Sequence, residues 1–503
     1  MKPVLLFIAF VSILNAARND LFFDQTNLNP HNTPFPDKTL ADSIPPDSSG
    51  MDTVNSFELS QKMVPGWNLG NTLEALPNET SWGNPLTTQK IMDSVKAAGF
   101  NSVRIPVAWS KFIDDTSTYT IDQTWLDRVE QVVNYALNAG LYAIINEHWD
   151  NGWQIPSYAD SAYVNRRLAA MWLQIALQFR DYDSHLLFAG TNEIHMPNVY
   201  SAPTAENSKV QNGFNQIFVN TVRSTGGRNY YRYLIVQGYN TNIDNTKNYF
   251  IAPADSAPNR LLVEVHYYDP YNFTLNTDDK IIRWGDNASH LTRTETWANE
   301  SYADNQFQKM KTKFVDKGIG VILGEYGATI RTNLGSDDLN AEYEKYRVYY
   351  MQYITRSIER HGLVPYYWDV GYYGNHGSGL FDRTSGAHVY TDILEAITDT
   401  NKVNPVVGVA EPPSALKSFF LGQNYPNPFN PSTIITYEIP AVSYVILKIY
   451  NILGREVSTL VNGIKNPGRY EVKFDAGNLM SGIYLYRLQA GRFTETRKLI
   501  VLK

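Results

Sequence analysis

The sequence predicts a (β/α)₈ barrel of class α/β, followed by a small all-β sandwich of immunoglobulin-like type. Three observations lead to this prediction. Between about residues 56 and 400, short apolar runs alternate with amphipathic segments of helical period. After about residue 419 the hydrophobic period becomes two, as in antiparallel strands. A Pro-containing stretch at 401–418 separates the two regions and is typical of a linker.

The N-terminal residues 1–17 have the pattern of a signal peptide. Lys2 is followed by the apolar run from Val4 to Leu14 and then by the small residues Ala16 and Ala17. Residues 18–55 are rich in Pro, Asn, Asp and Ser, lack an apolar period, and are expected to be a linker. We therefore expect an exported protein, passing through periplasm and outer membrane, that is secreted or attached to the cell surface.

The composition excludes several classes of function. The formal net charge is −7 without a Lys/Arg-rich run, so nucleic acid is not an expected partner. The absence of cysteine rules out disulfides, thiolate nucleophiles and Cys-ligated metals. Aromatic residues reach 13%, which suits an uncharged ligand with flat apolar faces, such as a sugar chain, and equally suits a large aromatic core.

The predicted barrel strands are near-continuous apolar runs, as expected for a parallel sheet covered by helices. They are Gly66–Gly70, Ser102–Pro106, Tyr142–Asn146, His185–Ala189, Tyr233–Gln237, Leu261–His266, Gly320–Gly324 and Val364–Trp368. The predicted helices include Thr88–Ala98, Gln123–Ala139, Tyr163–Arg180, Ala205–Ser224, Tyr302–Lys317 and Ala341–His361. An open doubly wound sheet is the alternative, but it would usually carry a Gly-rich nucleotide loop, and the sequence has none.

Polar and aromatic residues gather at the carboxyl ends of these strands, where a barrel places its active site. They are Asn68, Asn71, Arg104, His148, Asn192, Glu193, His266, Tyr268, Glu325 and Trp368. This concentration predicts a functional site at that end of the barrel.

Glu193 and Glu325 are the candidate catalytic pair. Glycosidic bond cleavage uses one protonated and one ionised carboxyl group on either side of the sugar. Asn192, next to Glu193, could hydrogen-bond a sugar hydroxyl, and Arg104 would keep Glu325 ionised by charge pairing. A lone glutamate at a strand end is more often a salt-bridge partner or a helix cap. The pair together points to catalysis.

Other candidate groups are weaker. Glu147 adjoins His148, but neighbouring strand residues point to opposite faces, so only one of them can face the site. The histidines form no metal motif, and no cofactor is expected. A Ser/His/Asp hydrolase would need a GxSxG turn, which is lacking.

Residues 419–503 alternate apolar and polar side chains, most clearly in Arg469–Asp475. Ser443–Tyr450, Gly482–Gln489 and Glu495–Leu502 are further predicted strands. This region carries no catalytic constellation.

Residues 56–400 resemble glycoside hydrolase family 5, a family of retaining (β/α)₈ enzymes rich in endoglucanases. The matching stretches follow family order: Gly66–Glu74, Glu79–Pro85, Val103–Val107, Ile145–Asp150, Thr191–Glu193, Val265–Tyr268, Leu323–Gly327 and Tyr367–Asp369. Two positions depart from the family pattern. Ile194 replaces the proline usually found after the acid/base, and Trp149 replaces the second residue of a His-His pair.

The resemblance implies a role for each matched residue. Glu193 would be the acid/base and Glu325 the nucleophile. Arg104 and Tyr268 would hold the nucleophile, and His266 would contact the acid/base. Trp368 would be a stacking platform for the sugar. The other matched residues would bind the sugar or support the site: His148, Asn192 and Asn68.

The last 85 residues resemble the type A sorting domain of type IX secretion. The resemblance rests on Asn424–Thr433, Tyr450–Val457, Ser481–Arg487 and a final strand ending in lysine. It implies the type IX secretion machinery as a partner. The alternative is a carbohydrate-binding sandwich, which would need a planar row of exposed aromatic residues.

Together these observations predict an exported, monomeric endo-β-1,4-glucanase that acts on cellulose-type or mixed-linkage β-glucans by double displacement. A mannanase or xyloglucanase built on the same barrel, and a non-catalytic glycan-binding surface protein, are the alternatives.

Overall fold

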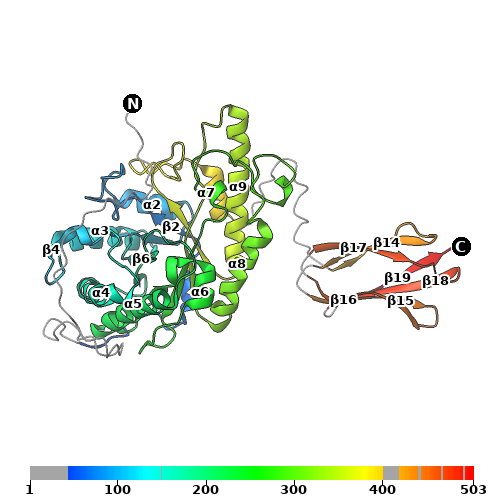
Figure 1. Ribbon diagram of the computed structural model, residues 1–503, viewed down its shortest axis with the longest axis horizontal. Helices are drawn as coiled ribbons and strands as arrows, with labels where there is room; N and C mark the ends of the chain where they lie inside the picture. The colour runs from blue at the N-terminus through cyan, green and yellow to red at the C-terminus, as the bar shows by residue number, and fades with distance from the viewer. Residues whose placement is uncertain are drawn as a thin grey trace. The chain divides into compact units, whose positions relative to one another are not determined.

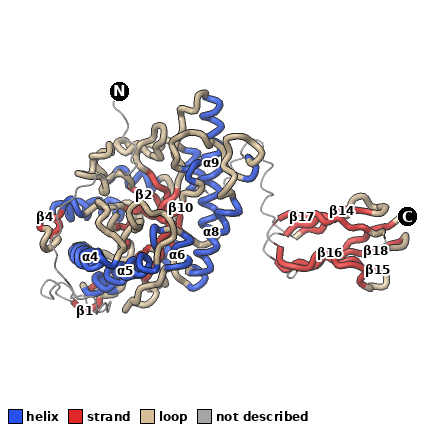
Figure 2. Tube along the Cα trace, viewed as in Figure 1, coloured by secondary structure: helices blue, strands red, loops and turns tan. Residues whose placement is uncertain are grey.

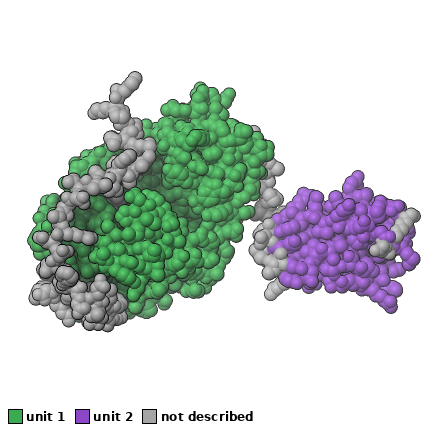
Figure 3. Space-filling model, viewed as in Figure 1, with its two compact units in different colours: residues 1–402 green, residues 403–503 purple. Residues whose placement is uncertain are grey.

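The structure is a computed structural model that describes residues 44–148, 150–399, 419–439, 443–465, 468–477, 479–490 and 493–502. The predicted signal peptide, the first part of the N-terminal linker, the 401–418 linker and Trp149 lie outside these residues. The chain divides into two compact units, residues 1–402 and 403–503 (Figure 3). Within the described parts of the chain, none of the helices combines the length and apolarity needed to cross a membrane.

The first unit is built around a closed barrel of parallel strands, which confirms the (β/α)₈ prediction. In barrel order the strands are β2 (Gly66–Leu69), β3 (Ser102–Ile105), β6 (Tyr142–Asn146), β7 (Leu186–Ala189), β9 (Leu234–Gln237), β10 (Leu261–Tyr267), β11 (Val321–Tyr326) and β12 (Val364–Asp369). Each overlaps a predicted strand. β11 runs two residues further than predicted, so Glu325 lies inside the strand.

Helices form the outer layer of this unit (Figure 1). They are α1 (Ser56–Gln61), α2 (Gln89–Ala97), α3 (Gln123–Asn138), α4 (Tyr158–Gln178), α5 (Ala205–Ser224), α6 (Ile243–Tyr249), α7 (Tyr271–Thr274), α8 (Glu300–Lys313), α9 (Asp337–Arg360) and α10 (Thr391–Thr398). A short hairpin of β4 (Ile113–Asp115) and β5 (Thr120–Ile121) follows β3.

Helix caps explain why α4 and α9 begin earlier than predicted. α4 begins five residues before the predicted start because the Ser157 side chain accepts a hydrogen bond from the Asp160 amide. α9 begins earlier for the same reason, since Ser336 caps it through the Leu339 amide. Apolar periodicity alone misses these polar first turns.

The barrel domain extends further toward the N-terminus than its predicted start at residue 56. β1 (Ile44–Pro46) pairs in parallel with β8 (Gly226–Gly227). Met51 is buried, and Asp52 forms an ion pair with Lys62. Residues 44–55, assigned to the linker on composition, therefore pack against the first unit.

The second unit is a β-sandwich, as predicted (Figure 2). One sheet contains β13 (Phe420–Leu421), β14 (Ser432–Ile439) and β17 (Gly468–Asp475); the other contains β16 (Glu456–Lys465), β15 (Ser443–Asn451), β18 (Gly482–Ala490) and β19 (Phe493–Val501). Its core includes Ile435, Leu447 and Tyr486, all fully buried. Tyrosines such as Tyr437 and Tyr486 face this core rather than the surface.

Candidate active site

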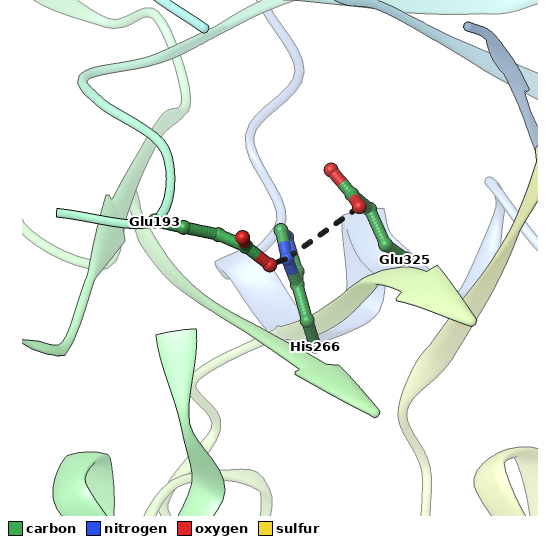
Figure 4. Close-up of side chains that lie close together, drawn as sticks. All are labelled: Glu193, His266 and Glu325. Carbon is green, nitrogen blue, oxygen red and sulfur yellow. Dashed lines mark hydrogen bonds and ion pairs between the residues drawn. The ribbon is translucent and has the colours of Figure 1, made fainter. Parts of the chain in front are cut away.

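The carboxyl ends of the barrel strands bring the predicted catalytic residues together. Glu325 projects from β11 and His266 from β10, while Glu193 lies in the loop after β7 (Figure 4). One carboxylate oxygen of Glu193 lies within 4.8 Å of one of Glu325, although the two residues are far apart in sequence. The Glu325 side chain is 8% exposed and the Glu193 side chain 41%. The two carboxyl groups are therefore paired but differ in their access to water.

Arg104 holds Glu325 from inside the barrel. Its side chain is fully buried, and Nη1 donates to Glu325 Oε1 at 3.1 Å and to Asn68 Oδ1 at 3.0 Å. Nη2 donates to Asn192 Oδ1 at 2.7 Å. A guanidinium is always charged in proteins, so it favours the ionised form of a carboxyl group in contact with it.

Tyr268 supplies a second donor to Glu325. Its hydroxyl donates to Oε2 at 3.2 Å, on the oxygen that Arg104 leaves free. Burial, followed by the charge of Glu325, raises the pKa of Tyr268 well above its usual value, so the hydroxyl remains a donor. Arg104 and Tyr268 therefore both contact Glu325, the predicted nucleophile.

His266 lies between the two glutamates and contacts Glu193 as predicted. Its Nδ1 is 2.7 Å from Glu193 Oε1 and 3.8 Å from Glu325 Oε2. Burial alone would lower the pKa of His266, but the charge of Glu325 and hydrogen bonds to Glu193 and Glu264 raise it to about 10. The imidazole is therefore a cation in the free protein.

The pKa of Glu193 moves in the direction opposite to that expected of a general acid. Desolvation raises it, but the hydrogen bond and charge of His266 outweigh desolvation and the net shift is downward. Burial raises the pKa of Glu325, and the net shift is upward despite the charges of His266 and Arg104. The proton nearest Glu193 therefore lies on His266 Nδ1, 2.7 Å from Oε1. The sequence predicted the contact between His266 and Glu193, but the direction of the pKa shift depends on charges from several strands and could not be predicted from it.

The remaining predicted residues lie around this centre. The His148 ring stacks on Trp368 with centroids 5.6 Å apart. Burial, followed by the charge of Arg104, lowers the pKa of His148 well below its usual range, which leaves a neutral imidazole. Asn68 is fully buried and donates to the carbonyl oxygens of Gly324, Tyr366 and Tyr367, so it supports the site without reaching a ligand.

Two buried residues of the site were missed. Glu264 lies 2.8 Å from Arg104 Nε and 3.3 Å from His266 Nε2. The side-chain amide of Gln237 on β9 donates to Glu264 Oε2 at 2.7 Å. A signal was present, since Glu264 interrupts an apolar strand two residues before His266 and so faces the same side.

Glu147 and Ile194 also have defined places. Glu147 is buried and accepts a hydrogen bond from Gln154, away from the Glu193–Glu325 pair, as strand alternation predicted. The Ile194 amide donates to the Asn192 carbonyl at 3.1 Å, a bond that the usual proline could not make.

The donor set favours proton transfer over metal binding. Glu193, His266 and Glu325 are close enough to hold a metal ion. However, His266 Nδ1 is already in hydrogen-bond contact with Glu193 Oε1 at 2.7 Å. Arg104 also presents a fixed positive charge to Glu325. Paired carboxylates with a protonated histidine suit acid/base and nucleophilic chemistry.

Two family models match the chain. Residues 68–374 match the cellulase model, glycosyl hydrolase family 5. Residues 423–502 match the secretion system C-terminal sorting domain, so the second unit is an export module.

Similar proteins agree with the barrel match. A xyloglucan-specific endo-β-1,4-glucanase of Bacteroides ovatus is 45% identical over 356 residues, covering 68% of this chain and 70% of that protein. A family 5 xyloglucanase structure from Paenibacillus pabuli has a TM-score of 0.65 at 38% identity, covering 68% of this chain and 100% of that one. A GH5-4 broad-specificity endoglucanase structure from Bacteroides salanitronis has a TM-score of 0.65 at 37% identity, covering 70% and 96%. Taken with the paired glutamates at the barrel mouth, these matches show that the chain belongs to glycosyl hydrolase family 5.

Proposed function

We propose that this protein is an exported endo-β-1,4-glucanase that cleaves β-glucan chains with retention of anomeric configuration. The spacing of the carboxyl groups of Glu193 and Glu325 carries the proposal. Retaining glycosidases have the two groups about 5–5.5 Å apart, and inverting ones about 6.5–9.5 Å. One oxygen of each group lies within 4.8 Å of one oxygen of the other, a short approach that fits the retaining class.

In the first step Glu325 attacks the anomeric carbon and Glu193 protonates the leaving oxygen. The Arg104 and Tyr268 contacts orient Glu325 and stabilise its ionised form. The proton moves from His266 Nδ1 to Glu193 as the leaving oxygen takes up negative charge. The C–O bond breaks, a glucosyl ester of Glu325 forms, and the shortened chain leaves as an alcohol.

In the second step Glu193 acts as the base. It takes a proton from a water that enters where the leaving chain was, and the hydroxide attacks the same anomeric carbon. The ester bond breaks and Glu325 is released as a carboxylate. The greater exposure of the Glu193 side chain suits this role, because water must reach it.

The stacked pair of His148 and Trp368 fits a sugar site beside the nucleophile. A neutral imidazole can both donate to and accept from sugar hydroxyls. The Asn192 side-chain oxygen is held by Arg104, which leaves its amide hydrogens for a ligand.

The stereochemical assignment is tested by proton NMR during hydrolysis of a cello-oligosaccharide. Retention gives the β-anomer first, followed by mutarotation. Initial release of the α-anomer would refute the roles of Glu193 and Glu325.

Xyloglucan is the second candidate substrate, since two of the similar proteins described above are named xyloglucanases. Initial rates on carboxymethylcellulose, mixed-linkage glucan, xyloglucan and mannan separate the possibilities. A preference for xyloglucan over unbranched glucans would assign the decorated polymer, whereas a preference for mannan would refute the glucanase proposal.

We also propose that the second unit directs the protein through the type IX route to the medium or the cell surface, and that the enzyme acts as a monomer. Deleting residues 423–502 should abolish export in a host with that machinery while leaving the activity of the intracellular enzyme unchanged. Export of the truncated chain would refute the proposal that residues 423–502 direct secretion. Sedimentation equilibrium tests the oligomeric state.

A further inference from the structure

Glu264 is a buried carboxylate to which the mechanism above gives no role. It is fully buried on β10 and contacts three groups from three strands. Oε1 lies 2.8 Å from Arg104 Nε on β3 and 3.3 Å from His266 Nε2, and Oε2 accepts from Gln237 Nε2 on β9. Burying such a group is costly unless all its contacts are satisfied, so its place beside the catalytic centre calls for a function.

The backbone makes room for this carboxylate. Gly324 sits in β11 where the pairing of β10 and β11 shifts register, between Val265 and His266. A Cβ on Gly324 would lie 2.0 Å from Glu264 Oε1. The absence of a side chain at this position is what allows the carboxylate to reach both Arg104 and His266.

We propose that Glu264 is a positioning residue for the acid/base: it holds the hydrogen on His266 Nε2, so that the transferable proton always lies on the Nδ1 side, facing Glu193. This rests on the proposed function. An ionised carboxylate can only accept, so the imidazole nitrogen facing Glu264 must keep its hydrogen. The other nitrogen then either donates to Glu193 or receives the proton back from it.

The surrounding charges support this arrangement. Burial raises the pKa of Glu264, but the charge of Arg104 and the contact with His266 lower it to about 2, so Glu264 stays ionised. The other ionisable groups facing His266 are Glu193, Glu325, Arg104 and His148. Without the Glu264 charge, His266 would have one carboxylate contact fewer, so its pKa would fall and it would lose its proton at lower pH.

The test is Glu264→Gln, which keeps the shape and removes the charge. The alkaline limb of kcat/KM on a cello-oligosaccharide should move to lower pH by about one unit or more. The rate on this substrate should fall by about tenfold or more, because its leaving group needs a proton. An activated aryl β-cellobioside, whose phenolate leaves unprotonated, should lose much less activity. A merely structural role would lower both rates equally and leave the pH profile unchanged.

The matched control is the double variant Glu264→Gln with Gln237→Glu. The two residues are paired across β9 and β10, so this exchange conserves the buried charge and the hydrogen bond between them. The new carboxylate would accept from the Thr191 amide and hydroxyl, which now donate to Gln237. We expect this variant to regain thermal stability but to keep the shifted alkaline limb, because the charge no longer faces His266 Nε2.

A wild-type pH profile in the double variant, or in Glu264→Gln itself, would overturn the inference. If Glu264→Gln does not fold, the double variant decides alone. Failure of the proposed function looks different, because the wild-type protein would then cleave neither substrate.

Discussion

Tyr268→Phe removes a single oxygen atom and so tests the hydrogen bond from Tyr268 to Glu325, the proposed nucleophile. The hydroxyl of Tyr268 donates to Glu325 Oε2 at 3.2 Å, long for an O–H···O bond. Hydrogen bonds to charged groups contribute about 1.5–3 kcal/mol, and this length suggests the lower end. Since 1.4 kcal/mol corresponds to a factor of ten, kcat/KM should fall by about tenfold.

The pH profile adds a signature specific to this contact. A donor bound to the ionised carboxylate lowers the pKa of Glu325, so removing it raises that pKa. The acidic limb of kcat/KM should therefore move to higher pH, with activity lost earlier as the pH falls. Rates measured across pH with one cello-oligosaccharide give both quantities.

Tyr267→Phe is the matched control, since it makes the same chemical change one residue earlier. Tyr267 points away from the site and packs against Phe307, with ring centroids 5.0 Å apart. Its buried hydroxyl has no hydrogen-bond partner among the described residues, so its loss should cost nothing. Equal losses in the two variants, or an unchanged acidic limb in Tyr268→Phe, would refute the reasoning.

Three further predictions concern the catalytic pair and its support. Glu325→Ala should abolish hydrolysis of every substrate, whereas Glu193→Ala should still form the glycosyl-enzyme from an activated aryl glycoside, seen as a phenolate burst; a burst from Glu325→Ala would exchange the roles. Gly324→Ala should lower the free energy of unfolding by about 2 kcal/mol, because the added Cβ would clash with Glu264. The control is Gly213→Ala in α5, where a Cβ meets nothing within 4 Å, and this change should raise the free energy of unfolding by up to about 1 kcal/mol. Equal melting temperatures of the two variants would contradict this prediction. Because folding lowers the pKa of Glu264 from 4.5 to about 2, its stabilising contribution is present above pH 4.5 and lost toward pH 2. Acid unfolding should therefore be less steep in Glu264→Gln, and identical acid titrations would argue against an ionised Glu264.

The barrel and the sandwich could be predicted because their strands, and the helices of the barrel, have a clear hydrophobic periodicity. All eight barrel strands were located from apolar runs, and α5 was placed at its observed bounds, Ala205–Ser224. Where the first turn of a helix is polar, as in α4 after its cap Ser157, hydrophobic periodicity does not show the start of the helix, and the capping residue sets it. The packing of residues 44–55 was likewise invisible, because β1 pairs with a segment far along the chain.

The sequence by itself determined the architecture and predicted which residues would meet at the barrel mouth, since strand ends in a barrel converge by topology. Only the tertiary structure decided the protonation of the site. Barrel closure brings Arg104, Glu264, His266, Glu193 and Glu325 within contact distance, and their pKa values depend on charges that belong to different strands. For this reason the upward pKa shift expected of a general acid is reversed at Glu193 by the protonated His266 beside it.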